Sequence, residues 1–228
     1  MRVKQPRMYM SQSYFVGLLL AFVGGYLDVY TYVCRGGVFA NAQTGNMVLL
    51  AINLAERKLE MVIKYTLPIL AFMAGVLIVE EIRYRFRFNT KIHWRQIIIA
   101  LELIVLGGIA FVPSGATDDL VNIAVAFVCS MQVESFRTFE GSSSYTTTMC
   151  TGNLRTATEH LFYARVNKDH AKQKKSLKYY GIIAVFIVGA TVSMLITQKY
   201  GEKSILLSCF LLLLVFVLMF IPVQKQNQ

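Results

Sequence analysis

Charged residues are scarce in this chain. Only 16% of its 228 residues are charged, whereas 55% are hydrophobic and the mean hydropathy is +0.51. A soluble domain normally carries roughly 25% charged residues. Several apolar stretches approach the roughly 20 residues that a helix needs to cross a hydrocarbon core of about 30 Å. The composition therefore excludes an ordinary soluble domain and predicts an integral membrane protein, with the lipid bilayer as its partner.

Residues that build metal sites and disulfide frameworks are also few. The four cysteines have no CxxC spacing, and the three histidines have no metal-ligand spacing. The sequence therefore predicts neither a metal site nor a cofactor. A membrane-embedded enzyme would need a nucleophile with an activating base. Cys150 is the only tempting nucleophile, and no histidine has a reason to approach it. We expect no catalytic residues and no enzymatic activity.

Acidic residues are outnumbered by basic ones. The 23 Lys and Arg against 13 Asp and Glu give a formal net charge of +10. On a soluble protein this excess would suggest a nucleic-acid partner. Here the basic residues lie in loops beside hydrophobic segments, where retention on the cytoplasmic side of a membrane explains them better. Nucleic acid is therefore not an expected partner.

The apolar pattern predicts an all-α polytopic membrane protein. Besides six expected transmembrane helices, the chain contains two segments that have a helical pattern but are doubtful as spans. Segment 44–55 is short, and segment 151–166 carries Arg155, Glu159 and His160, which cannot comfortably face lipid. We interpret both as short re-entrant or half helices. The six transmembrane helices are expected at about 14–34, 62–82, 96–112, 120–137, 179–198 and 204–223.

Both doubtful segments begin with Thr-Gly-Asn, which indicates an internal repeat. Upstream of each lies a hydrophobic span that ends in a polar patch. Asp28 precedes Thr44 by 16 residues, and Glu134 precedes Thr151 by 17. The repeat length is about 110 residues. We therefore expect one membrane domain over residues 1–228, with repeat one at 14–112 and repeat two at 119–223.

The basic loops predict the orientation of the two repeats. Residues 83–95 carry five Lys or Arg and residues 165–178 carry six, whereas the acidic loop 112–119 carries none. The positive-inside rule puts the first two loops in the cytoplasm, as six spans with cytoplasmic N- and C-termini require. Each repeat then crosses three times, so the repeats are inverted. One alternative has seven spans, because segment 44–55 also crosses the membrane while segment 151–166 does not, but this places the basic N-terminus outside the cell.

The Thr-Gly-Asn helices could form a binding site. Each threonine is a candidate N-cap, each glycine permits close approach of a ligand or backbone, and each asparagine both donates and accepts hydrogen bonds. Two helix N-termini meeting near the midplane would suit an anion or carboxylate. The alternative is that the motifs only cap two short packing helices. The residues concerned are Thr44, Gly45, Asn46, Thr151, Gly152 and Asn153.

Ionisable residues inside predicted spans are costly unless they are paired or hydrated. Asp28 lies in the first span, and Glu134 and Arg137 occupy the corresponding stretch of the second repeat, near Gln132. Glu134 could pair with Arg137 on one helix face, or Asp28 could pair with Arg137 across the repeats. Either a buried salt bridge or a proton- or cation-coupling carboxylate would result. Glu102, early in its span, could instead snorkel to the inner surface.

The chain resembles a known family. GGYLDVYTY followed by FANAQTGNMVLLA, and then Gln132, Arg137 and TTTMCTGNL, resembles the YoaK family of bacterial multi-pass membrane proteins, a domain-of-unknown-function family. The resemblance covers essentially the whole chain and implies six spans and the bacterial plasma membrane. The chain reads Ser130 to Glu134 where the family tends to show Gly-x-Gln-Asn. The matching residues are Asp28, Asn41, Gln43, Thr44, Gly45, Asn46, Gln132, Arg137, Thr148, Thr151 and Gly152.

These observations favour a transporter or permease for an unknown small solute or ion, with a central site between the repeats. The alternatives are a passive channel or a non-transport membrane partner protein, and less favoured is an enzyme. A homo-oligomer is compatible with the small mass of 25.8 kDa, although no sequence feature marks an interface. The predicted binding residues are Asp28, Asn41, Gln43, Thr44, Gly45, Asn46, Gln132, Glu134, Arg137, Thr148, Thr151, Gly152 and Asn153.

Overall fold

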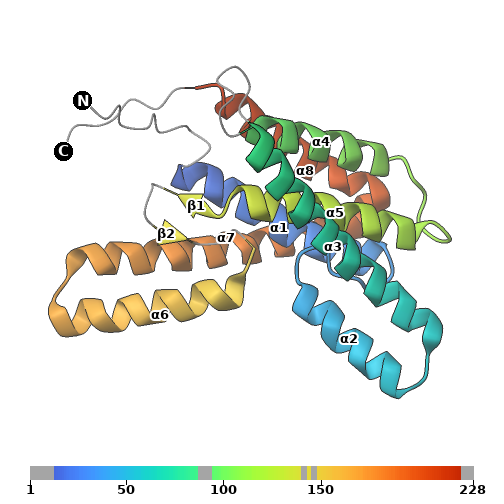
Figure 1. Cartoon of the computed structure of the whole chain (residues 1–228), viewed down its shortest axis with the longest axis horizontal. Coiled ribbons are helices and arrows are strands. Elements are labelled where there is room, and N and C mark those ends of the chain that lie inside the picture. Colours follow the sequence, from blue (N-terminus) through green and yellow to red (C-terminus); the bar gives the residue numbers. More distant parts are fainter. Residues whose placement is uncertain (1–12, 87–93, 140–142, 145–147, 222–228) are drawn as a thin grey trace.

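A computed structural model describes residues 13–86, 94–139, 143–144 and 148–221. These residues are almost wholly helical, which confirms the all-α prediction (Figure 1). A two-residue antiparallel pair, β1 (Thr138–Phe139) and β2 (Ser143–Ser144), is the exception. The helices are α1 (Tyr14–Cys34), α2 (Gln43–Ala55), α3 (Leu59–Phe86), α4 (Trp94–Ile109), α5 (Asp118–Ser135), α6 (Cys150–Asn167), α7 (His170–Tyr200), the 3-10 helix η2 (Gly201–Ile205) and α8 (Leu206–Leu218).

Three helical stretches within the described residues are long and apolar enough to cross a membrane. They are Tyr14–Cys34, Leu59–Phe86 and the 49-residue stretch His170–Leu218, in which α7, η2 and α8 follow one another without a break. By comparison, α4 has only 16 residues, and α5 carries three acidic residues in its 18. The chain is thus helical and membrane-like in part, while the count of six spans stays a prediction.

The helices pack in corresponding pairs. Helix α1 packs along α7, and α3 packs along α5; α2 pairs with α3, and α6 pairs with α7. Helix α4 contacts α5 and α8, and α8 also contacts α1. Exchanging α1–α4 for α5–α8 leaves this set of neighbours unchanged. The first helix of each half therefore packs mainly against the third helix of the other half.

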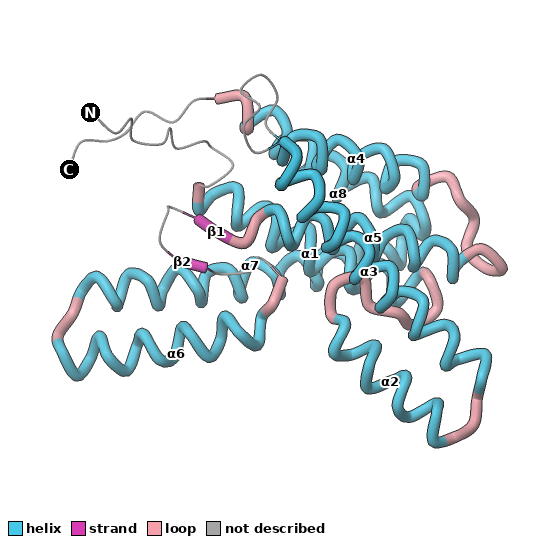
Figure 2. Tube along the Cα trace, in the orientation of Figure 1, coloured by secondary structure: helices cyan, strands magenta, loops and turns pink. Residues whose placement is uncertain are grey.

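The loops gather at two opposite ends of the molecule. The α2–α3 and α4–α5 loops lie at one end, at the right in Figure 2, and the α6–α7 loop lies at the other. Helices α2 and α6 both begin near the middle of the molecule and run outward toward different ends (Figure 1). The two Thr-Gly-Asn motifs therefore start their helices in the interior and not at either end.

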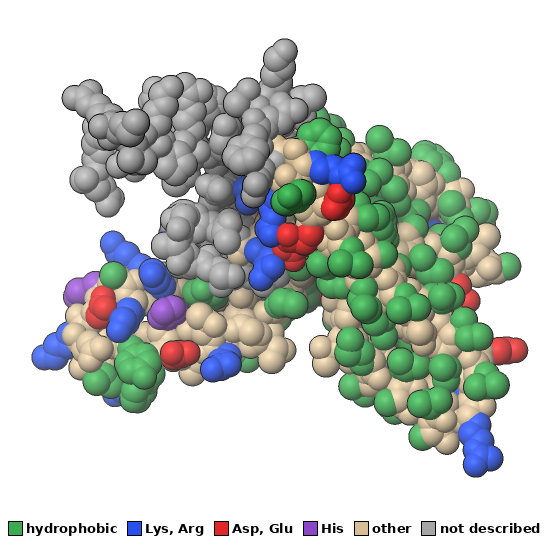
Figure 3. All heavy atoms as spheres, in the orientation of Figure 1, with side chains coloured by type: hydrophobic (Ala, Val, Ile, Leu, Met, Phe, Trp, Pro, Cys, Tyr) green, Lys and Arg blue, Asp and Glu red, His purple; other side chains and the backbone are tan. Residues whose placement is uncertain are grey.

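The outer surface of the helices is apolar over much of its area. Leu70, Met73 and Leu77 on α3 are 52%, 56% and 69% exposed, and hydrophobic side chains cover much of the face in Figure 3. Soluble monomers rarely expose large contiguous apolar patches. Basic, acidic and histidine side chains gather instead along α6 and the start of α7 (Figure 3). The apolar surface is what lipid contact requires.

Candidate functional site

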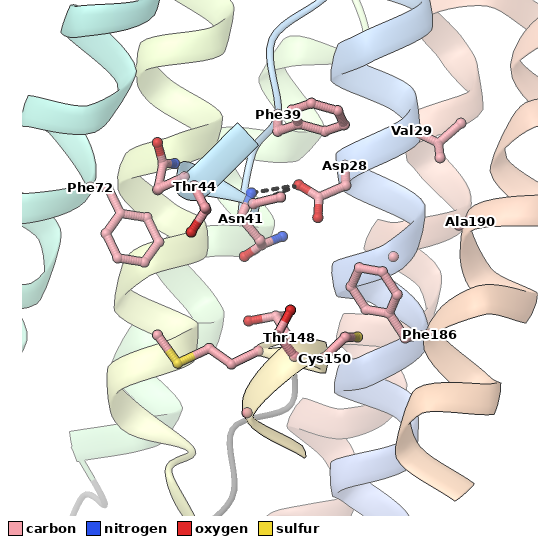
Figure 4. A pocket seen from close by; sticks show the side chains of 16 residues that line it. Asp28, Val29, Phe39, Asn41, Thr44, Phe72, Thr148, Cys150, Phe186 and Ala190 are labelled. Carbon is pink, nitrogen blue, oxygen red and sulfur yellow. Dashed lines mark hydrogen bonds between the residues drawn. The ribbon is translucent and has the colours of Figure 1, made fainter. Parts of the chain in front are cut away.

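A cavity of about 540 Å³ lies where α2 and α6 begin (Figure 4). Helices α1, α3 and α7 supply the rest of its wall. The lining residues are Gly25, Asp28, Val29, Phe39, Asn41, Ala42, Gln43, Thr44, Phe72, Thr148, Met149, Cys150, Thr151, Gly152, Phe186 and Ala190.

The starts of α2 and α6 use backbone atoms, and the prediction that their threonines are N-caps is wrong. The N-cap residues are Ala42 and Met149, and neither helix has a side-chain cap. The Ala42 carbonyl accepts from the Asn46 amide at 3.4 Å, and the Met149 carbonyl accepts from the Asn153 amide at 3.1 Å. Because each helix begins one residue before its threonine, the threonine falls within the first turn, where it lines the cavity.

The residue two positions before each helix also behaves alike in the two halves. The Gln43 amide donates to the Asn41 carbonyl at 2.8 Å, and the Cys150 amide donates to the Thr148 carbonyl at 3.1 Å. Both tight turns precede a Thr-Gly-Asn motif by the same number of residues. The two segments are therefore locally equivalent in structure as well as in sequence.

Asp28 connects the first of these turns to α1. Its side chain is 5% exposed, and Oδ1 accepts from the amides of Asn41 at 2.6 Å and Ala42 at 3.2 Å. The Asn41 side chain in turn donates to the Gly24 carbonyl at 3.2 Å. A negatively charged carboxylate near the N-terminal end of a helix also interacts favourably with the helix dipole. Asp28 therefore fixes the loop before α2 and contributes a carboxylate to the cavity wall.

The acidic and basic groups of the second half lie apart from this cavity. Arg137 donates to Glu134 at 3.0 Å, as the spacing predicted, and Glu134 lies 3.8 Å from Arg83. The alternative pair between Asp28 and Arg137 does not form. Glu102 does not snorkel: it is 1% exposed, and neither carboxylate oxygen has a hydrogen-bond partner among the described residues.

Asn46 holds in place the backbone of Phe39, one of the residues that line the cavity. It is fully buried, its Oδ1 accepts from the Phe39 amide at 2.9 Å, and its Nδ2 donates to the Phe39 carbonyl at 2.8 Å and to Gln43 Oε1 at 2.9 Å. A Cβ on Gly45 would lie 2.8 Å from the Phe39 ring. These two residues therefore place Phe39, which lines the cavity, without lining it themselves.

We expect Asn46→Ala to destabilise the chain by about 2 kcal/mol, because it leaves the partly buried amide and carbonyl of Phe39 without these partners. The matched control is Asn53→Ala on the same helix, since the Asn53 side chain makes one hydrogen bond within the described part of the chain, to the Leu49 carbonyl. Thermal unfolding of the two purified variants in detergent checks this expectation. Equal midpoints for the two variants would contradict the role given to Asn46.

The structure brings seven of the thirteen predicted binding residues together. Those that line the cavity are Asp28, Asn41, Gln43, Thr44, Thr148, Thr151 and Gly152. The other six do not line it: Gly45, Asn46, Gln132, Glu134, Arg137 and Asn153. Of these, Gln132 is buried and donates to the Leu20 carbonyl at 3.4 Å, so it joins α5 to α1.

A comparison with family models places the chain. Residues 16–218 match the model described as a protein of unknown function, DUF1275. The chain belongs to the DUF1275 family. This is the YoaK-like family that the motifs indicated, so that recognition is confirmed. No curated protein and no solved structure matches the chain. Membership in DUF1275 therefore identifies the family without assigning an activity.

Sequence reasoning missed the aromatic walls of this DUF1275 cavity. Phe72 of α3 and Phe186 of α7 face each other across it, with Phe39 nearby (Figure 4). A signal was present: each of the first two begins a Phe-x-x-Gly sequence that ends at Gly75 or Gly189. Matching the third helices of the two repeats would have found it.

Proposed function

We propose that this chain is a small-solute transporter or permease whose substrate binds in the cavity between two inverted repeats. The observation that carries the proposal is the cavity wall itself, to which both halves contribute corresponding groups. Thr44 is matched by Thr151, and Phe72 by Phe186. When two halves build a site together, rocking of one half against the other can open that site first to one side of the membrane and then to the other.

The packing of the helices supports the inverted, six-span arrangement. Exchange of the two halves leaves the main helix pairs unchanged, as a two-fold relation between repeats 14–112 and 119–223 requires. Helix α2 has 13 residues and is roughly 20 Å long at 1.5 Å per residue, too short for a core of about 30 Å. Helix α8 also has 13 residues, but η2 precedes it without a break, so the helical stretch there runs from Gly201 to Leu218. A re-entrant α2 agrees with six spans and disfavours seven.

We place the chain in a bacterial plasma membrane, as the family resemblance implies, and the charge distribution supports cytoplasmic termini. Segments 83–95 and 165–178 are basic, although the second, expected as a loop, consists mostly of the end of α6 and the start of α7; the acidic segment 112–119 lies between α4 and α5. Basic loops are retained in the cytoplasm. In Figure 1 the α6–α7 loop lies at the opposite end from the α4–α5 loop. This separation is what the six-span orientation expects.

Cys150 provides a test of solute access because it lines the cavity. In a variant that retains Cys150 alone, we expect a membrane-impermeant thiol reagent to modify it both from outside intact cells and from the cytoplasmic side in inverted vesicles. An alternating-access site must reach each side in turn. Labelling is measured by the mass of the purified protein.

The matched control retains only Cys129, which is 1% exposed and does not line the cavity. It should resist the reagent from both sides. Labelling of Cys150 from one side only, or from neither, would contradict a transport path and favour a non-transport membrane partner.

A further inference from the structure

The charge of Asp28 has no cationic partner in the described part of the chain. Its Oδ1 is held by two backbone amides, and its other oxygen points into the cavity in Figure 4. The basic residue nearest to it in sequence, Arg35, is paired with Asp118. No lysine, arginine or histidine is among the described residues that line the cavity. A buried carboxylate in a membrane interior is costly without a partner, so this site lacks a positive group.

Aromatic rings surround the position where that positive group would lie. Phe39, Phe72 and Phe186 approach the cavity from three directions, with Asp28 between Phe39 and Phe186 in Figure 4. The face of a phenyl ring attracts a cation within about 6 Å of its centre, and more strongly where water is excluded. A carboxylate among phenylalanines is the combination that recognises an organic ammonium ion.

The threonine hydroxyls at the starts of the two helices suit the same ligand. Thr44, Thr148 and Thr151 line the cavity, and each hydroxyl can accept a hydrogen bond from an ammonium group. The N-terminal end of α2 is already compensated by Asp28. An anion would therefore meet the negative charge of Asp28 and, among the described lining residues, no basic side chain, which disfavours the carboxylate ligand that two helix N-termini alone would suggest.

We propose that the cavity binds a small organic molecule with a protonated amine and an apolar body, the amine on Asp28 and the apolar body between Phe72 and Phe186. This inference rests on the proposed transport function and adds the chemical class of the solute.

Three probes of similar size and different charge test the proposal. They are 2-phenylethylamine (a cation at pH 7), the neutral 2-phenylethanol and the anionic 3-phenylpropanoate. Each is titrated into detergent-purified protein, and binding is read as thermal stabilisation. We expect the amine to bind, with the alcohol and the anion at least about tenfold weaker, since a hydrogen-bonded ionic contact is worth about 1.5–3 kcal/mol.

Asp28→Asn should weaken binding of the amine by about 10- to 100-fold. The new side-chain oxygen can still accept from the Asn41 and Ala42 amides, so the loop keeps its anchor. The matched control is Glu102→Gln, which removes another buried carboxylate that does not line the cavity and should leave amine binding unchanged. If Asp28→Asn does not fold, Phe72→Leu should weaken binding of the amine and of the alcohol alike, by about 2- to 5-fold, because the apolar body that packs on Phe72 is common to both.

The proposal is overturned if the alcohol or the anion binds as tightly as the amine, if none of the three binds, or if folded Asp28→Asn keeps wild-type affinity. These results are separate from the access of reagents to Cys150. If Cys150 is labelled from both sides and one of these binding results is also found, the transport proposal is retained and the amine is rejected as its solute.

Discussion

Replacement of Arg35 with alanine should destabilise the chain by about 3 kcal/mol, because it removes one partner of a buried ion pair. The Arg35 side chain has no exposed surface, and its Nη1 lies 3.1 Å from Asp118 Oδ1. Its guanidinium also donates to Tyr30 Oη at 2.9 Å and to the Val112 carbonyl at 2.8 Å. One side chain therefore joins the end of α1 to the α4–α5 loop and the start of α5.

The polar groups around Arg35 would lose these partners together. The Asn122 side chain donates to the Arg35 carbonyl at 2.7 Å, and this backbone contact survives the substitution. Asp118 is 16% exposed, so water can solvate it in part, which is why we place the loss at the lower end of the range for buried pairs. For a chain of this size the apparent melting temperature should fall by roughly 6–12 °C.

The matched control is Arg85→Ala, measured by the same thermal unfolding in detergent. Arg85 is 70% exposed and pairs with Glu81, which is 56% exposed, on the surface of α3. Exposed pairs contribute about 0–1 kcal/mol, so this variant should unfold close to wild type. Equal midpoints for the two arginine variants would show that the Arg35 contacts do not stabilise the fold.

Sequence patterns located some helices closely and others less closely. The span expected at 14–34 is α1 to the residue, and the segments expected at 44–55 and 151–166 differ from α2 and α6 by one residue at one or both ends. Helix α7, in contrast, begins at His170, nine residues before the start expected at 179, because its polar residues 170–178 continue the helix beyond the apolar stretch. Apolar composition therefore marks the membrane-like part of a helix and not its polar end. The all-α class and the family therefore followed from sequence alone.

The cavity and the Arg35 contacts could not be derived in the same way. Phe186 and Gly25 are far apart in sequence and meet only because α7 packs along α1. In the sequence, Arg35 directly follows the first predicted span, and nothing near it indicates Asp118 as its partner. The threonine caps failed for a different reason, since backbone carbonyls compete with side chains for the same amides and here they are the acceptors. Long-range pairing was the missing information.

Replacement of Gly189 with alanine should be as damaging as loss of Arg35, at about 3 kcal/mol, because α1 and α7 touch through their backbones. A Cβ on Gly189 would lie 2.2 Å from the Phe22 carbonyl oxygen, and one on Gly25 would lie 2.1 Å from that of Phe186. Backbone atoms inside two helices cannot rotate away. The helices must therefore separate, and the contacts along their interface weaken together.

The matched control is Gly108→Ala on α4, where an added Cβ meets no atom within 4 Å. There the substitution removes only the low helix propensity of glycine, worth about 1 kcal/mol, so this variant should be neutral or slightly stabilised. Thermal unfolding and the yield of folded protein in detergent compare the two. Since Phe186 and Ala190 flank Gly189 and line the cavity, Gly189→Ala should also weaken any ligand of the cavity, whereas Gly108→Ala should not. A Gly189→Ala protein as stable as the control would mean that α1 and α7 do not pack this closely, and the shared cavity wall that supports the transport proposal would lose its basis.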